Sequence, residues 1–173
     1  MSVSDVKETV ELIEKIRKQY AGSKDNPCCF NDKKIDPAWI DEAERLLNLK
    51  FPADYRYFLE HLGAGDIFGS EFYGIMDKGL MVSGIPNVVW LTLEERESPY
   101  GKLPNYFLPV YDLGIGDYYV LDCRDPENTP LYIWMPGFHE EGDELEIIAD
   151  SFGAFFKETI FEAKKAEEED EKA

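Results

Sequence analysis

Residues 107–122 read Phe107-Leu-Pro-Val-Tyr-Asp-Leu-Gly-Ile-Gly-Asp-Tyr-Tyr-Val-Leu-Asp122. Two short runs of apolar and aromatic residues, 107–111 and 118–122, flank a connection that contains Gly114 and Gly116. Because glycine tolerates positive φ, these two residues suit a short connection between antiparallel strands. The stretch therefore predicts a β-hairpin.

Short apolar runs separated by turn residues also occur on both sides of the hairpin. Past Gly65, short apolar runs alternate with Gly, Pro, Asn and Asp, which is a pattern of strands and turns. The additional predicted strands are 71–75, 131–135 and 145–148. Between 71–75 and the hairpin, Thr92 is followed three residues later by Glu95, which predicts a capping box and one or two helical turns.

Apolar residues at helical spacing predict helices before the sheet and after it. One helix spans 4–19, a second opens at Asp36-Pro37 with an Asp N-cap, and a third begins at Pro52. A closing helix opens near Ser151. Residues 21–34 lack periodicity and are predicted to be a loop. Helices, an antiparallel sheet and a closing helix together predict an α+β fold.

Length and charge limit the organisation and the partners of the chain. Its 173 residues predict a single domain, 1–166, followed by an acidic tail at 167–173. The net charge is −18, and the tail holds five acids and one lysine, so most of the acidity belongs to the domain. Direct nucleic-acid binding is excluded because a phosphate-binding surface needs clustered Lys and Arg. A basic protein partner is favoured.

The sequence also predicts the compartment. Charged residues interrupt the first ten positions, where a signal peptide needs a continuous apolar stretch. No run approaches 18 apolar residues, so no membrane segment is expected. Three cysteines, two of them adjacent, are poor material for a disulfide framework. We expect a cytoplasmic protein.

Residues able to support chemistry are sparse. His61 lies near a predicted helix end, and His139 precedes an acidic run that reads equally well as a solvated loop. Neither histidine belongs to a His or Cys pair whose spacing would fix the geometry of metal ligands, and Cys28-Cys29 is not a Cys-x-x-Cys motif. Glycine-rich phosphate-binding motifs are missing. We predict no catalytic residue, no cofactor and no metal.

Carboxylates and aromatic residues around the hairpin are the remaining candidates. Strand alternation places Asp117 and Asp122 on opposite sides, so the two are not expected to form a catalytic dyad. Such carboxylates often cap turns, and aromatic side chains often fill cores, but both also suit a protein interface. The predicted partner-contact residues are Asp112, Asp117, Tyr118, Asp122, Tyr132, Trp134, Glu140 and Glu141.

The order of motifs resembles a known family. The motifs are Ile40-Asp-Glu-Ala-Glu-Arg-Leu-Leu, Phe51-Pro-Ala-Asp-Tyr-Arg-Tyr-Phe-Leu-Glu-His-Leu-Gly-Ala-Gly65, Leu108-Pro-Val, Gly116-Asp-Tyr-Tyr-Val-Leu-Asp122, Ile133-Trp and Ile148-Ala-Asp-Ser-Phe-Gly-Ala-Phe-Phe. Together they resemble the SUKH superfamily (Smi/Knr-type domain) over about residues 36–160, in particular the branch related to a fungal regulator of cell-wall synthesis. The amino-terminal segment with Cys28-Cys29 lies outside this pattern.

The resemblance implies an α+β fold without catalytic residues. Bacterial members are commonly immunity proteins that bind and neutralise a cognate polymorphic or contact-dependent toxin, often a nuclease or a deaminase. We therefore expect an immunity protein that binds a basic toxin through an acidic, aromatic surface. The alternative is a regulatory scaffold like the fungal relatives. A metal-assisted hydrolase is disfavoured, because the sequence shows no geometry for activating water on a metal.

Overall fold

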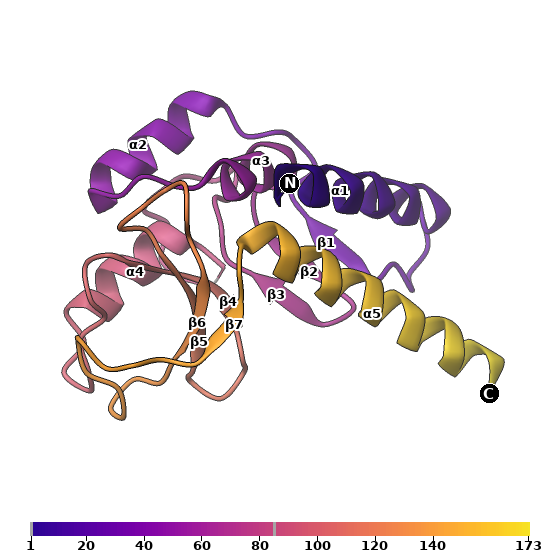
Figure 1. Ribbon diagram of the computed structural model, residues 1–173. Helices are drawn as coiled ribbons and strands as arrows, with labels where there is room; N and C mark the ends of the chain where they lie inside the picture. The colour runs from indigo at the N-terminus through magenta and orange to yellow at the C-terminus, as the bar shows by residue number, and fades with distance from the viewer. Residues whose placement is uncertain (1, 85) are drawn as a thin grey trace.

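The computed structural model describes residues 2–84 and 86–173 and has an α+β architecture (Figure 1). Within these residues lie five helices and a seven-stranded sheet. The helices are α1 (Ser2–Gln19), α2 (Pro37–Leu47), α3 (Ala53–His61), α4 (Val88–Arg96) and α5 (Phe152–Lys172). The strands are β1 (Cys28–Phe30), β2 (Gly65–Ile67), β3 (Ser70–Phe72), β4 (Phe107–Asp112), β5 (Tyr118–Asp122), β6 (Leu131–Trp134) and β7 (Ile147–Ala149).

Each strand pairs antiparallel with the next in sequence, in the order β1-β2-β3-β4-β5-β6-β7. The predicted hairpin is β4–β5, with Leu108 opposite Leu121. Gly114 and Gly116, in the connection, have φ of 76° and 88°, as the turn requires. The predicted α+β class and the central antiparallel sheet are confirmed.

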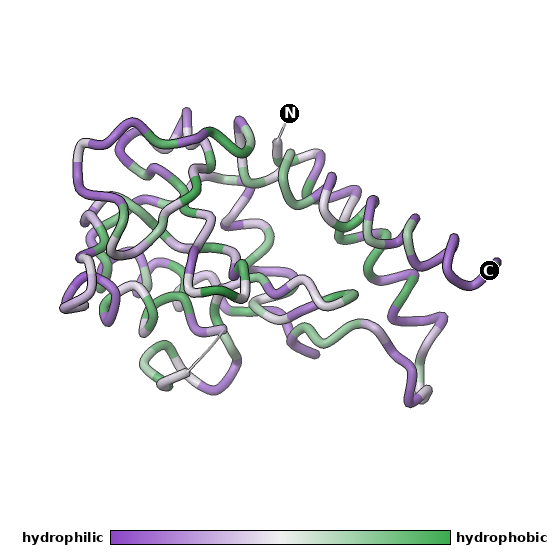
Figure 2. Tube along the Cα trace, turned by 90° about the horizontal axis from the view of Figure 1, so that it is seen from below, coloured by the Kyte–Doolittle hydropathy of each residue, from purple (hydrophilic) through white to green (hydrophobic). Residues whose placement is uncertain are grey.

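Helices α1, α3 and α5 cover one face of the sheet. Phe58 of α3 lies 6.1 Å from Phe72 of β3 and 5.2 Å from Phe152 of α5, measured between ring centroids. Leu108 and Leu121 belong to the same buried cluster. Figure 2 shows that hydrophobic residues line the packed parts of the chain, whereas the far end of α5 is hydrophilic.

The start of α1 packs against the start of α5, beside α3. A Cβ at Gly153 would lie 2.1 Å from the Ser2 carbonyl oxygen, so only glycine lets α5 approach α1 this closely. The Gly153 N–H donates to the buried Asp54 carboxylate of α3 at 2.8 Å. Further along α5, Lys157 pairs with Glu8 at 2.7 Å. One end of α5 is therefore fixed to both α1 and α3.

Two short strands lie where sequence patterns predicted none. The predicted loop 21–34 contains β1, and β2 begins at Gly65, shortly after the end of α3 at His61. Both strands have three residues, too few to show a period of two. Phe30 and Ile67 are nevertheless buried in the core. The predicted strand 71–75 starts one residue earlier and ends at Phe72, and residues 167–172 continue α5 as helix.

The predicted capping box is wrong. Helix α4 begins five residues earlier, where the side chain of its N-cap, Asn87, accepts hydrogen bonds from Val89 N (3.0 Å) and Trp90 N (3.3 Å). Thr92 lies inside the helix, and its hydroxyl donates to the Val88 carbonyl at 2.6 Å. Asn is as good an N-cap as Thr, and the run Val88-Val-Trp that follows it conceals the helix start. None of the helices in the described part of the chain is long and apolar enough to cross a membrane.

Candidate functional site

The sheet face turned away from α5, here called the distal face, holds most of the predicted contact residues. In the register of the sheet, Asp112 lies opposite Tyr118 and Tyr118 opposite Trp134. Likewise Phe107 lies opposite Asp122, and Val120 opposite Tyr132. Directly opposed residues share a face. Asp112, Tyr118, Asp122, Tyr132 and Trp134 therefore project from the same side.

A row of three carboxylates crosses the amino-terminal half of the distal face. Asp66 of β2 is directly opposite Glu71 of β3. Because Phe72 pairs with Tyr111 in an antiparallel register, Glu71 lies beside Asp112 of β4. All three side chains are half-buried. We call Asp66, Glu71 and Asp112 the carboxylate row.

The negative charges of this row are not balanced within the protein. In residues 2–84 and 86–173, no Lys or Arg forms an ion pair with Asp66, Glu71 or Asp112. Burial, Asp112 and Asp66 together raise the pKa of the Glu71 carboxyl. Like charges directly opposite each other destabilise a sheet. The repulsion among these three carboxylates therefore destabilises the folded protein. A cationic group bound beside them would reduce that repulsion.

The β4–β5 turn brings three of the predicted contact residues to one end of the row. The Asp112 carboxylate accepts a hydrogen bond from Gly114 N at 2.7 Å. The Tyr118 hydroxyl donates to Glu95 of α4 at 3.2 Å. Burial, Glu95, Asp112 and Asp117 all raise the pKa of Tyr118. Asp112, Asp117 and Tyr118 thus lie close enough to act on one another.

Two of the predicted contact residues are buried. Trp134 is 1% exposed and packs with Phe107 in a second apolar cluster. Asp122 is 7% exposed, and its carboxylate accepts hydrogen bonds from the Arg124 guanidinium at 2.6 to 3.2 Å. A contact role does not fit this burial. Both side chains stabilise the distal face and offer almost no surface to a partner.

The other predicted residues lie around the connection between β6 and β7. Tyr132 and Glu140 line a hollow of about 320 Å³ that also includes Tyr106 and Arg124, and Glu141 is the next, exposed residue. The Arg124 guanidinium lies 4.2 Å from the Tyr106 ring centroid. Sequence reasoning missed Tyr106 and Arg124, because only the fold brings residues from three separate connections together here.

The residues that sequence analysis weighed for metal binding are engaged locally. His61 stacks on Tyr57 at 3.8 Å, and His139 Nδ1 accepts a hydrogen bond from Met135 N at 3.0 Å. Burial raises the pKa of the Cys123 thiol to about 12. Among the described residues, no three His, Cys, Asp or Glu side chains are grouped so that they could hold a metal ion.

These features define an α+β domain whose meander sheet carries α1, α3 and α5 on one face and, on the other, an acidic and aromatic surface bordered by α4. Residues 37–156 match the family model described as SMI1-KNR4 cell-wall (SUKH_6), so the chain belongs to the SUKH superfamily. Helix α1, strand β1 and most of α5 lie outside the match. Comparison with curated proteins found no match.

Proposed function

We propose that this protein is an immunity protein that binds and neutralises a basic toxin domain. The observation that carries the proposal is the carboxylate row. Asp66, Glu71 and Asp112 repel one another on adjacent strands, with no basic residue of the described chain paired to them. A cationic partner surface would convert this repulsion into attraction.

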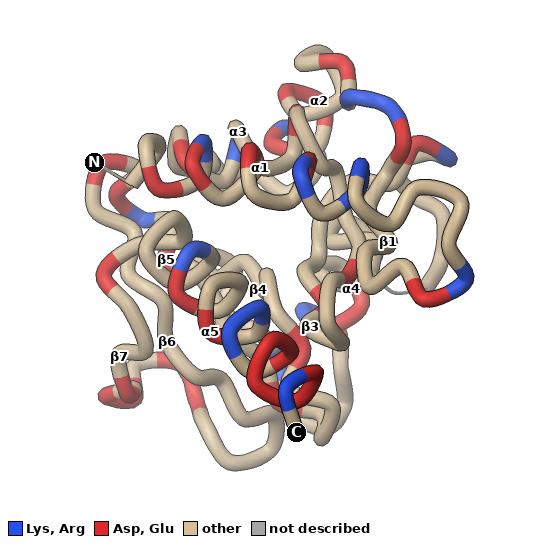
Figure 3. Tube along the Cα trace, turned by 90° about the vertical axis from the view of Figure 1, so that its right-hand side faces the viewer, with Lys and Arg blue, Asp and Glu red and all other residues tan. Residues whose placement is uncertain are grey.

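The charge of the whole chain supports the same partner. The net charge is −18, and Figure 3 shows Asp and Glu on helices and connections alike. Such a field accelerates association with a cationic surface, and the effect weakens with salt. A toxin that acts on nucleic acid needs basic residues to hold phosphates. A nuclease or deaminase domain is therefore the class of toxin that this charge suits best.

Co-expression with the toxin domain encoded beside this chain tests the proposal. We expect the wild type to protect cells and to form a stoichiometric complex whose association rate falls steeply as salt is raised. The double variant Glu71→Gln and Asp112→Asn should associate more slowly, while Glu158→Gln, an exposed carboxylate on α5, should not. A wild-type protein that neither binds nor protects would refute the proposal.

A regulatory scaffold is the second candidate, and the description of the matched family, which refers to the cell wall, favours it. A scaffold docks several enzymes, whereas an immunity protein binds one toxin. Affinity capture followed by identification of the bound proteins separates the two. Recovery of several endogenous enzymes in place of one toxin would favour the scaffold.

A further inference from the structure

Two aromatic side chains are far more exposed than the rest of the aromatic set. Tyr100 is 82% exposed and Phe138 is 84% exposed. A single exposed ring is unremarkable in a soluble protein. Aromatic residues that dominate binding energy, however, lie near one another at the centre of an interface. Tyr100 and Phe138 can therefore form the centre of an interface only if they lie on one surface of the protein.

Contact between backbones places them together. A Cβ at Gly101 would lie 2.5 Å from Gly137 N, so the backbones of the two connections touch where both residues are glycine. Tyr100 precedes one of these glycines, and Phe138 follows the other. The first connection joins α4 to β4, and the second joins β6 to β7. We call residues 98–101 and 135–139 the aromatic loop pair.

Hydrogen bonds to backbone N–H groups support the turn in each loop. The Met135 carbonyl accepts from Phe138 N and from His139 N, each at 3.0 Å. In return, Met135 N donates to His139 Nδ1, and the His139 ring packs 5.7 Å from that of Trp134. On the other loop, Tyr100 N donates to Ser98 Oγ at 3.3 Å. An anchor that is already ordered loses less conformational entropy on binding.

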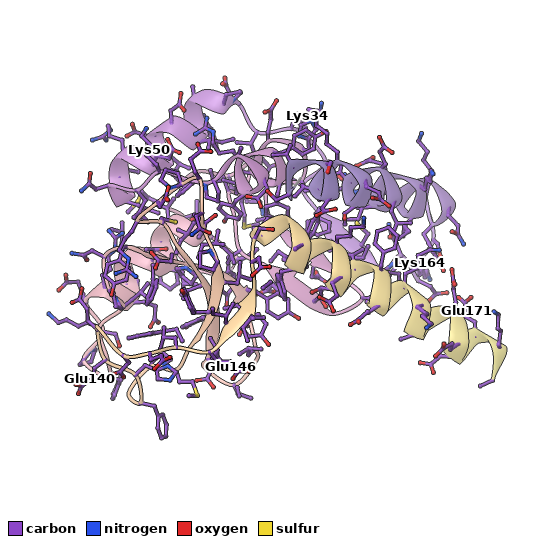
Figure 4. The ribbon with its side chains drawn as sticks, in the orientation of Figure 1. Lys34, Lys50, Glu140, Glu146, Lys164 and Glu171 are labelled. Carbon is purple, nitrogen blue, oxygen red and sulfur yellow. The ribbon has the colours of Figure 1, made fainter. Side chains whose placement is uncertain are left out.

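The surroundings of the loop pair are mainly acidic, although the exposed Lys102 follows Gly101. Phe138 is followed closely by exposed carboxylates at Glu140, Glu141, Asp143 and Glu144. Figure 4 shows Glu140 at the opposite side of the molecule from Lys34 and Lys50. An apolar centre beside carboxylates is complementary to a segment that carries both apolar and basic side chains. A second copy of this chain is a poor occupant, because two proteins of charge −18 repel each other.

We propose that the aromatic loop pair is a docking site for a protein segment in which apolar side chains alternate with Lys or Arg. Tyr100 and Phe138 contact the apolar side chains, and Glu140 and its acidic neighbours attract the basic ones. The proposal rests on the proposed function only for the identity of the partner, a basic toxin.

Two synthetic peptides of equal charge test the site on the full chain. The probes are acetyl-Arg-Leu-Arg-Leu-Arg-amide and acetyl-Arg-Gly-Arg-Gly-Arg-amide, with binding followed by calorimetry or NMR. We expect the wild type to bind the leucine peptide at least about fivefold more tightly, because contact with the two rings removes apolar surface from water. In the double variant Tyr100→Ser and Phe138→Ser, the two affinities should agree within twofold.

Ile115→Ser is the matched control, because Ile115 is 78% exposed at the β4–β5 turn, outside the loop pair. This variant should keep the wild-type preference. Equal affinities in the wild type, undetectable binding of both peptides, or a preference that survives in the double variant would each overturn the docking site. Because no toxin enters this measurement, its outcome is independent of whether the chain neutralises one.

Discussion

Replacing Glu71 by Gln should stabilise the protein at neutral pH. Glu71 lies between Asp66 and Asp112, so the substitution removes one like-charge repulsion on each side. Each opposed pair is worth about 0.2–1 kcal/mol, and solvent screens these half-buried groups. We expect a gain of about 0.5–1 kcal/mol in the free energy of unfolding. For a chain of this size that corresponds to roughly 1–4 °C in Tm.

The gain should depend on pH in a defined direction. Burial and the two neighbouring carboxylates raise the folded pKa of Glu71 above its value in the unfolded chain. The folded state therefore holds this proton more tightly, and stability is lost as pH rises from the unfolded pKa, about 4.3, through the folded one. Above that window the penalty is fully present and Gln removes it. Near pH 3 the carboxyl is protonated in both states, and the advantage of Gln should vanish.

Denaturant unfolding of wild type, Glu71→Gln and Glu158→Gln at pH 7 and pH 3 measures this effect. The α5 variant supplies the control, because its exposed carboxylate lies on the other side of the sheet. A Glu71→Gln protein no more stable than wild type at pH 7, or a gain of equal size at pH 3, would refute the electrostatic reasoning. The same variant should bind a basic partner more weakly.

Three further predictions concern the core. Asp54→Ala should lower the free energy of unfolding by about 2–3 kcal/mol in denaturant titrations, because Gly153 N and Tyr55 N lose their acceptor. Gly153→Ala should cost about 1–3 kcal/mol in the same assay, since α5 must move away from Ser2. Cys123, buried with a pKa of about 12, should resist alkylation at pH 8 until the protein unfolds, whereas exposed Cys29 should react at once; mass spectrometry of the alkylated peptides distinguishes them.

Sequence patterns predicted the elements whose period extends over many residues. The β4–β5 hairpin and the helices at both ends were predicted because their apolar residues recur over five or more positions. Strands β1 and β2 were not predicted because they lie in segments whose Gly, Asp and Asn residues indicate turns, and because their pairing depends on contacts between residues such as Cys29 and Asp66, far apart in sequence. The start of α4 was predicted wrongly because Thr92 matches the sequence pattern of an N-cap, whereas the N-cap in the structure is Asn87.

The candidate site was predicted less completely than the fold. The alternation of side chains along a strand predicted that Asp117 and Asp122 face opposite sides. It could not predict that Glu71 lies beside Asp112, because this depends on the register between β3 and β4. Composition could not show that Trp134 is buried while Phe138 is exposed, because both are large aromatic residues near the end of one strand. Glu140 and Glu141 were chosen for their charge, and the fold places them beside a hollow that contains Tyr106.

The pairing of α1 with α5 has a consequence for biosynthesis. About 130 residues separate the end of α1 from the start of α5, whereas every strand of the sheet pairs with its immediate neighbour in sequence. At roughly 5–20 residues per second, α1 leaves the ribosome about 7 to 27 s before α5, one of the two helices that pack against it. We expect Val6, Val10 and Ile13 to be accessible to chaperones on the nascent chain, and the sheet to be complete before α5 closes the fold.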